Sequence, residues 1–126
     1  MLPLKIKAKV TAGKGRGKGL GIPTINFVIP QKFSLSHGVY AGKIFIEGKY
    51  LPAAIHLGPR PVFKENDISL EVYVLSHIVV IPDETEIIFH KRIRDIMSFT
   101  NPMSMVKQIK KDVKEIKKIL KIKTLP

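Results

Sequence analysis

Cysteine is absent from this sequence of 126 residues, and so is any uninterrupted run of 18 apolar residues. The lack of cysteine excludes a disulfide framework, a thiolate zinc site and a cysteine nucleophile. A membrane-spanning helix needs a long apolar run, and residues 1–10 alternate lysine with apolar residues instead of forming a signal-peptide core. We therefore expect a soluble, cytoplasmic protein whose residues 1–126 fold as a single domain.

Acidic residues are scarce at both ends of the chain. Residues 1–46 carry eight Lys or Arg and no acid, residues 47–102 carry six basic and eight acidic residues, and residues 103–126 carry eight Lys and two acids. The net charge of +12 is therefore concentrated at the two ends. Such a charge favours an anionic partner, and composition alone leaves open nucleic acid, a membrane surface or a phosphorylated small molecule.

Alternating and β-branched apolar residues predict six or so short strands. The segments with this pattern are 4–10, 26–29, 39–46, 50–57, 68–75, 78–81 and 86–93. Glu47-Gly48-Lys49 is typical of a hairpin turn, and Gly58-Pro59-Arg60-Pro61 is typical of a rigid loop. The strands do not alternate with helices, so a Rossmann-like sheet is not expected.

A helix is predicted only at the end of the chain. Apolar residues recur there at steps of three and four up to Leu120, and Asn101-Pro102 is a suitable helix start. The chain is therefore expected to be mainly β, with a small antiparallel barrel over about 4–100 and a C-terminal α-helix over about 103–122.

Five glycines at alternate positions, separated mostly by basic residues, make residues 13–21 the first candidate for a binding segment. The glycines are Gly13, Gly15, Gly17, Gly19 and Gly21, and Lys14, Arg16 and Lys18 lie between them. The spacing is neither that of a Walker A loop nor GxGxxG. Backbone N–H groups and cationic side chains could surround phosphate oxygens. A basic tether or a nucleic-acid-binding arm is the alternative interpretation.

Two oxygen-bearing side chains follow this segment. In a strand, Thr24 and Asn26 share one face, and Ile25 points to the other. Neutral oxygen ligands beside a phosphate-binding loop suit a Mg²⁺ ion that the phosphates also bind. The simpler alternative is that both residues cap a turn after Pro23.

Glu71 is a candidate general base. It lies in a strand between apolar neighbours, with Leu70 and Val72 on the opposite face. Apolar surroundings raise the proton affinity of carboxylates in general, which suits a base. A solvated surface charge is the commoner role for a lone acid in a strand.

Several segments occur in the same order as in the riboflavin kinases. They are 13–26 (GKGRGKGLGIPTIN), 38–42 (GVYAG), 58–63 (GPRPVF) and 70–72 (LEV), followed by Arg94, Phe99 and 105–112. The chain thus resembles the ATP-dependent flavokinase domain over roughly residues 5–115. This resemblance implies a six-stranded Greek-key β-barrel with a C-terminal helix. It also implies transfer of the ATP γ-phosphoryl group to the 5′-hydroxyl of riboflavin, giving FMN and ADP.

The resemblance also implies roles for particular residues. Thr24 and Asn26 would bind Mg²⁺ and the nucleotide phosphates, and Glu71 would take the proton of the attacking hydroxyl. Arg94 and Phe99 would flank the flavin. The residues expected to bind the nucleotide are Gly13, Gly15, Arg16, Gly17, Lys18, Gly19, Gly21, Pro23 and Thr24. The implied partners are riboflavin or FMN and ATP or ADP, with a monomeric state and without a membrane or nucleic acid.

Some positions depart from the pattern of that family. His56, Pro59 and Val62 replace Asn, Thr and Thr, which are common there, Tyr73 replaces a frequent His, and Ile81-Pro82 replaces Tyr-Gly. These departures leave two alternatives open, a catalytically inactive flavin-binding regulator and a non-enzymatic barrel that binds nucleic acid. An FAD synthetase segment is not found in the sequence, so FMN adenylylation is not expected.

Overall fold

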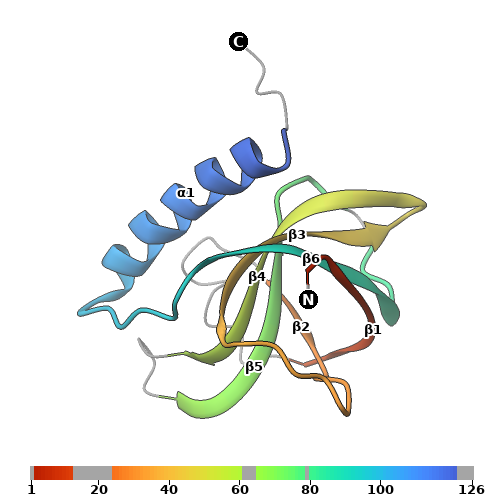
Figure 1. Ribbon diagram of the computed structural model, residues 1–126, viewed down its shortest axis with the longest axis horizontal. Helices are drawn as coiled ribbons and strands as arrows, with labels where there is room; N and C mark the ends of the chain where they lie inside the picture. The colour runs from red at the N-terminus through yellow and green to blue at the C-terminus, as the bar shows by residue number, and fades with distance from the viewer. Residues whose placement is uncertain (1, 13–23, 61–64, 79, 122–126) are drawn as a thin grey trace.

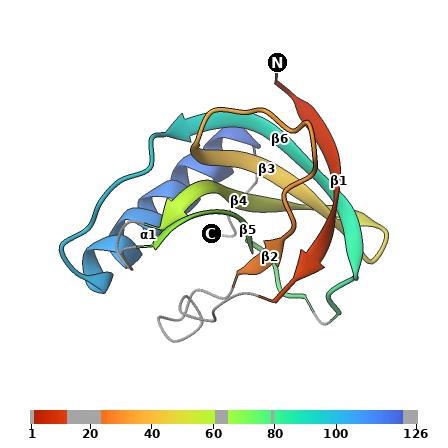
Figure 2. The same ribbon diagram turned by 90° about the horizontal axis from the view of Figure 1, so that it is seen from below.

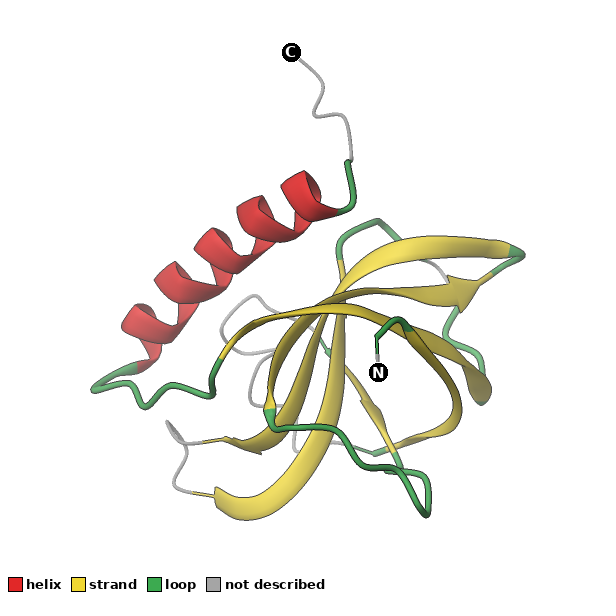
Figure 3. Ribbon diagram, in the orientation of Figure 1, coloured by secondary structure: helices red, strands yellow, loops and turns green. Residues whose placement is uncertain are grey.

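The computed structural model describes residues 2–12, 24–60, 65–78 and 80–121, which form an antiparallel β-barrel with a helix beside it (Figure 1). The elements are β1 (Leu4–Thr11), β2 (Ile25–Phe27), β3 (Gly38–Ile46), β4 (Lys49–Arg60), β5 (Glu65–Val74), β6 (Glu84–Arg94) and α1 (Pro102–Ile119). Figure 3 shows this division into strands and one helix in the described part of the chain.

The strands close into a barrel in the order β1-β2-β5-β4-β3-β6. Strands β3, β4 and β5 pair consecutively, and β6 returns to pair with β3, which is the Greek-key arrangement. Strand β1 completes the closure between β6 and β2. The expected fold class, a six-stranded antiparallel barrel with a C-terminal helix, is therefore confirmed. Seen from below, α1 lies on the side of the barrel away from β1 (Figure 2).

Alternate residues of each strand fill the barrel interior. The buried inward residues include Ile25, Phe27, Ile44, Ile55, Leu57, Leu70, Val72, Ile87 and Phe89. Because successive side chains of a strand point to opposite faces, the residues between them lie on the outer surface. Asn26, Glu71 and His56 are three of these outward residues, and the pairing register places Asn26 opposite Glu71 and Glu71 opposite His56.

The hairpin between β3 and β4 forms at the predicted turn. Glu47 and Gly48 have φ angles of 52° and 77°. Positive φ at both central residues is the geometry that matches the twist of the two strands in a short hairpin. Lys49 is already paired with Ile46, so the turn is one residue shorter than the sequence indicated.

Two local predictions are wrong. Residues 58–60 do not form a separate loop but continue β4 through a register shift, where Gly58 has φ of 141°. In segment 78–81, the described residues Ile78, Val80 and Ile81 are not in a strand, and Val80 and Ile81 are more than half exposed. A closed barrel offers no free edge with which this segment could pair. The residue that follows directly, Pro82, also disfavours a strand.

Helix α1 begins at the predicted position and packs on the outside of the barrel. The side chain of Asn101 accepts a hydrogen bond from the Ser104 backbone N–H at 2.9 Å, and Pro102 occupies the first turn. Ile116 is fully buried against Ala41 and Ala54, on β3 and β4. The helix ends at Ile119, about three residues before the predicted end near residue 122.

A charged pair joins the end of β6 to this helix. The Arg94 guanidinium donates to both carboxylate oxygens of Asp112, at 2.9 and 2.8 Å, and Gln108 donates to one of them at 3.1 Å. The Asp112 side chain is only 5% exposed. A buried carboxylate needs such partners because losing its hydration is costly.

Two lysines that precede the glycine-rich segment are paired within the barrel wall. Lys5 lies 3.9 Å from Glu86 and Lys7 lies 3.5 Å from Glu84, across the β1–β6 pair. These exposed pairs add little stability. They do show that part of the N-terminal positive charge already faces carboxylates of β6.

Replacing Asp112 with Ala is expected to destabilise the fold, because Arg94 would remain largely buried without its carboxylate partner. We expect the free energy of unfolding to fall by about 3 kcal/mol, which corresponds to a decrease in Tm of about 10 °C for a chain of this size. Thermal unfolding followed by circular dichroism would measure this. Glu115→Ala, at an exposed acid of the same helix, is the control and should change Tm by less than about 2 °C. Equal Tm values for the two variants would contradict the structural role of the pair.

His90 is expected to make stability depend on pH. Its side-chain Nε2 is buried and has no hydrogen-bond partner among the described residues. Burial lowers the pKa of His90, and the charge of Lys43 lowers it further. The unfolded chain, with a His pKa of about 6.5, therefore binds this proton more tightly, and stability is lost as the pH falls below about 6.5.

The corresponding measurement is Tm at pH 7.5 and at pH 5.5. In His90→Gln the decrease in Tm on acidification should be smaller than in the unaltered protein. His77→Gln, at an exposed histidine, should show the full decrease. An identical decrease in all three proteins would exclude a contribution from His90.

Candidate functional site

A row of polar side chains crosses three neighbouring strands on the outer face of the barrel. Asn26 of β2, Glu71 of β5 and His56 of β4 lie directly opposite one another in the register. Their neighbours Ile25, Leu70 and Val72 are buried in the interior, which turns these polar residues outward. Asn26 and Glu71 themselves are 45 positions apart in the sequence. The barrel therefore brings together residues that the chain keeps apart.

The Glu71 carboxylate is held at both of its oxygens. Thr24 Oγ1 donates a hydrogen bond to Oε1 at 3.0 Å, and Ser69 Oγ donates to Oε2 at 3.1 Å. The Glu71 side chain is only 12% exposed, so it is not a solvated surface charge. Largely buried carboxylates need hydrogen-bond donors, and the two hydroxyls meet that need.

His56 lies beside the same carboxylate. Its Nδ1 is 3.9 Å from Glu71 Oε2, and its side chain is 26% exposed. The contact is an ion pair when the imidazole is protonated. In the sequence His56 stands out only as a departure from a family pattern, whereas in the structure it lies next to the candidate base.

Thr24 and Asn26 present oxygen atoms beside Glu71. Thr24 donates its hydroxyl proton to Glu71, which leaves the lone pairs of its oxygen available to a cation. A hydroxyl and an amide oxygen are hard ligands of the kind that Mg²⁺ accepts, commonly together with substrate phosphates. The described residues hold no cluster of three His, Cys, Asp or Glu that could bind a metal by itself. A small protein ligand set completed by nucleotide phosphates fits the side chains present.

The proposed phosphate-binding segment falls outside the described residues. This applies to Gly13, Gly15, Arg16, Gly17, Lys18, Gly19, Gly21 and Pro23, and to Val62 among the departures. Their predicted nucleotide-binding role stays a prediction. Thr24 is the one predicted nucleotide-binding residue within the described part of the chain.

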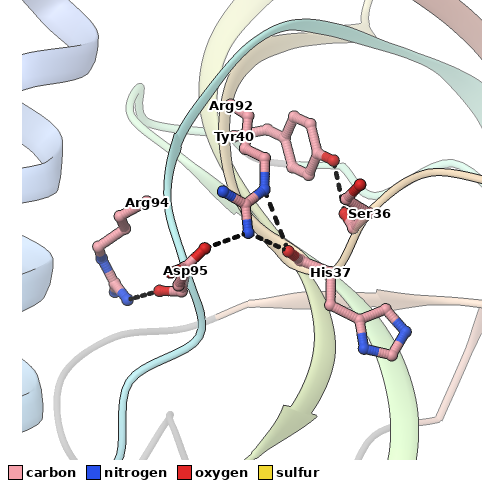
Figure 4. Close-up of polar contacts among 6 residues, drawn as sticks. All are labelled: Ser36, His37, Tyr40, Arg92, Arg94 and Asp95. Atoms are coloured by element: carbon pink, nitrogen blue, oxygen red, sulfur yellow. Dashed lines mark hydrogen bonds and ion pairs between the residues drawn. The ribbon is translucent and has the colours of Figure 1, made fainter.

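The end of β6 and the chain that follows it contact β4 and the segment that precedes β3. Arg92 Nη2 donates to the His37 carbonyl and to Asp95, both at 2.6 Å, and Arg94 Nη1 donates to the Asp95 carbonyl at 3.0 Å (Figure 4). A Cβ atom at Gly58 would lie 3.1 Å from the Ile96 side chain. Gly58 is two residues from His56, so segment 95–101 begins close to the site.

The two predicted flavin-flanking residues have different surroundings. The Arg94 guanidinium is bound to Asp112 and its side chain is 17% exposed, which gives it a role in joining β6 to α1. Phe99 is half-buried in the segment that follows. Their contacts with a flavin stay predictions.

Tyr73 is one of the departures from the family pattern. It packs against the cluster formed by Ala41, Ala54 and Ile116 and therefore belongs to the interface between barrel and helix.

The family model and the curated relatives indicate the same family. The model of the riboflavin kinase family, Flavokinase, matches residues 1–120. A bifunctional riboflavin kinase/FMN adenylyltransferase of Buchnera aphidicola subsp. Acyrthosiphon pisum is 31% identical over 107 residues, which cover 82% of this chain and 34% of that protein. The same bifunctional protein of Buchnera aphidicola subsp. Schizaphis graminum is 28% identical over 121 residues, which cover 92% of this chain and 38% of that protein. The chain thus spans about a third of the length of the curated relatives it matches.

Solved structures show the same barrel. Riboflavin kinase from Trypanosoma brucei superimposes with a TM-score of 0.64 at 22% identity, covering 97% of this chain and 82% of that one, which supports the fold. A Streptococcus pneumoniae protein described as a macrolide-efflux protein superimposes with a TM-score of 0.76 at 28% identity, covering 89% of this chain and 38% of that one.

The comparisons and the structure also bear on the other interpretations. No helix in the described part of the chain is both long enough and apolar enough to cross a membrane. The matches do not favour a nucleic-acid-binding barrel. A closed Greek-key barrel, a helix at its outer face and a family match across nearly the whole length lead to one assignment: the chain belongs to the riboflavin kinase family.

Proposed function

We propose that this chain is a riboflavin kinase, which transfers the γ-phosphoryl group of ATP to the 5′-hydroxyl of riboflavin to give FMN and ADP. The observation that carries the proposal is the Glu71 carboxylate, held by the hydroxyl of Thr24 and placed opposite Asn26 in the β2–β5 register. A base beside two oxygen ligands is the arrangement that phosphoryl transfer to a hydroxyl requires. The family match over residues 1–120 supports the same reaction.

In this proposal Glu71 acts as the general base. The ribityl oxygen forms a bond to the γ-phosphorus while the bond from that phosphorus to the β–γ bridging oxygen breaks. The hydroxyl proton passes to Glu71, and ADP leaves with the bridging oxygen. Because phosphoryl transfer depends mainly on alignment and charge neutralisation, one base and a few positioning groups are sufficient.

Thr24 and Asn26 would hold a divalent cation together with the nucleotide phosphates. Mg²⁺, when bound, neutralises negative charge on the transferring phosphoryl group. Thr24 would contribute through its oxygen while its proton remains donated to Glu71. Asn26 would contribute its amide oxygen from β2, two positions further along the chain.

The roles proposed for the remaining residues rest on the resemblance to the riboflavin kinases. Residues 13–21 would cover the ATP phosphates, and Arg94 and Phe99 would flank the flavin. A cytoplasmic location and a monomeric state stay predictions. The curated relatives are named for a second activity, FMN adenylylation, and we do not propose that activity for the segment described here.

The proposal is tested by incubating the protein with riboflavin, ATP and Mg²⁺ and separating the flavins by chromatography. FMN is expected to form. Glu71→Gln keeps the shape of the side chain but removes its basicity, so kcat should fall by about a hundredfold or more. Glu86→Gln, at an acid of the barrel wall paired with Lys5, is the matched control and should retain wild-type kcat within about twofold.

Two results would contradict the assignment. If the unaltered protein binds riboflavin but forms no FMN, it is the inactive flavin-binding regulator. If it forms FMN and Glu71→Gln does so at a similar rate, Glu71 is not the base.

The metal ligands predict a second effect. Thr24→Val removes a hydroxyl oxygen without changing the size of the side chain, and Asn26→Ala removes an amide oxygen. Each variant should need at least about tenfold more Mg²⁺ for half-maximal activity, because a ligand is lost. Thr24→Ser keeps the hydroxyl and should stay within about threefold of the unaltered protein. An unchanged Mg²⁺ requirement in both Thr24→Val and Asn26→Ala would place the cation elsewhere.

A further inference from the structure

Ser69 lies two residues before Glu71 on β5, so both side chains project from the same outer face of the barrel. Its hydroxyl oxygen is 3.1 Å from Glu71 Oε2 and 3.2 Å from the carbonyl oxygen of Gly58, the residue opposite it on β4. The sequence contains no signal that separates Ser69 from other strand serines. The structure shows it at the boundary between the candidate base and the β4 register shift.

The single hydroxyl proton of Ser69 has two acceptors to choose between. A serine hydroxyl donates one hydrogen bond at full strength. Hydrogen bonds to ionised acceptors are roughly twice as strong as bonds between neutral groups. Glu71 is only 12% exposed, so its carboxylate receives little help from water. These considerations favour donation to Glu71 over donation to the Gly58 carbonyl.

The two hydroxyl contacts act on different oxygens of the carboxylate. Thr24 binds Oε1 and Ser69 binds Oε2, so rotation of the carboxyl group about its last bond would break both contacts. That terminal torsion is otherwise broad and poorly determined in glutamate. A base that can rotate spends only part of its time aligned with its substrate, and small misplacements of catalytic groups reduce rates strongly.

We propose that Ser69 is a positioning residue for Glu71, which fixes the plane of the carboxylate by holding Oε2 while Thr24 holds Oε1. The proposal rests on the proposed function, because it assigns Glu71 the role of base. A purely structural role is the competing explanation, in which the Ser69 hydroxyl only supports the Gly58 carbonyl at the register shift. The two explanations predict different changes on removing the hydroxyl.

Ser69→Ala tests the proposal through separate measurements of kcat, KM and Tm. We expect kcat to fall about tenfold, as for loss of a hydrogen bond to a charged group. The KM values for riboflavin and ATP should stay within about twofold, because the substrates do not contact Ser69 in this proposal. Ser69→Thr restores the hydroxyl and should recover kcat to within about threefold. Ser76→Ala, the same change just beyond the end of β5, is the matched control and should match the unaltered protein.

A double-mutant cycle shows whether Ser69 acts through Glu71. In a Glu71→Gln background, adding Ser69→Ala should change kcat by less than about twofold, since the group being positioned is already gone. A further tenfold loss in that background would overturn the proposal. So would a Ser69→Ala variant with lower Tm or raised KM but unchanged kcat, which is the expectation for a purely structural role.

A second cycle, measured by thermal unfolding, does not depend on enzymatic activity. If Ser69 donates to Glu71, the decreases in Tm caused by Ser69→Ala and Glu71→Gln should not add in the double variant. Additive decreases would overturn the contact. If the unaltered protein formed no FMN, the proposed function would be wrong, and this cycle would still decide whether Ser69 holds the Glu71 carboxylate.

Discussion

The closed register of the barrel is the constraint on which the site depends. Ile25, Leu70 and Val72 are buried because the interior needs apolar side chains, and this forces Asn26 and Glu71 outward and opposite each other. A slip of one residue in the β2–β5 pairing would turn Glu71 into the core. Closure around all six strands leaves no freedom for such a slip, so core packing and site geometry have the same cause.

Two largely buried carboxylates in this fold have different kinds of partner. Asp112 is bound at both oxygens by the Arg94 guanidinium, and this pair joins the helix to the barrel. Two parallel hydrogen bonds from one guanidinium fix the position of the carboxylate, which suits a permanent structural contact. Glu71 is held by hydroxyl groups of Thr24 and Ser69. These hydroxyl donors orient the Glu71 carboxylate, and His56 Nδ1 lies 3.9 Å from one of its oxygens.

Much of the fold follows from short-range patterns. The alternation of lysine and apolar residues predicted strand β1. The segment Glu47-Gly48-Lys49 predicted the hairpin turn, in which Gly48 has a positive φ. Asn101-Pro102 predicted the start of the helix. Segment 78–81 has the same β-branched composition as true strands, but its described residues Ile78, Val80 and Ile81 are not in a strand. Local composition reports only a preference, whereas pairing depends on whether a partner edge exists. The register shift at residues 58–60 was missed for the same reason, because it depends on the opposing strand.

By itself, the sequence determined the type of elements, the absence of cysteine chemistry, and the candidates Thr24, Asn26 and Glu71, because these depend on residue identity, spacing and resemblance over a few positions. Only the tertiary structure decided that Thr24 donates to Glu71 across 47 residues of chain, that Ser69 holds the other oxygen, and that Arg94 binds Asp112. These contacts join side chains through the register of separate strands and the packing of α1. No local pattern encodes such distances, because they exist only once the barrel has closed.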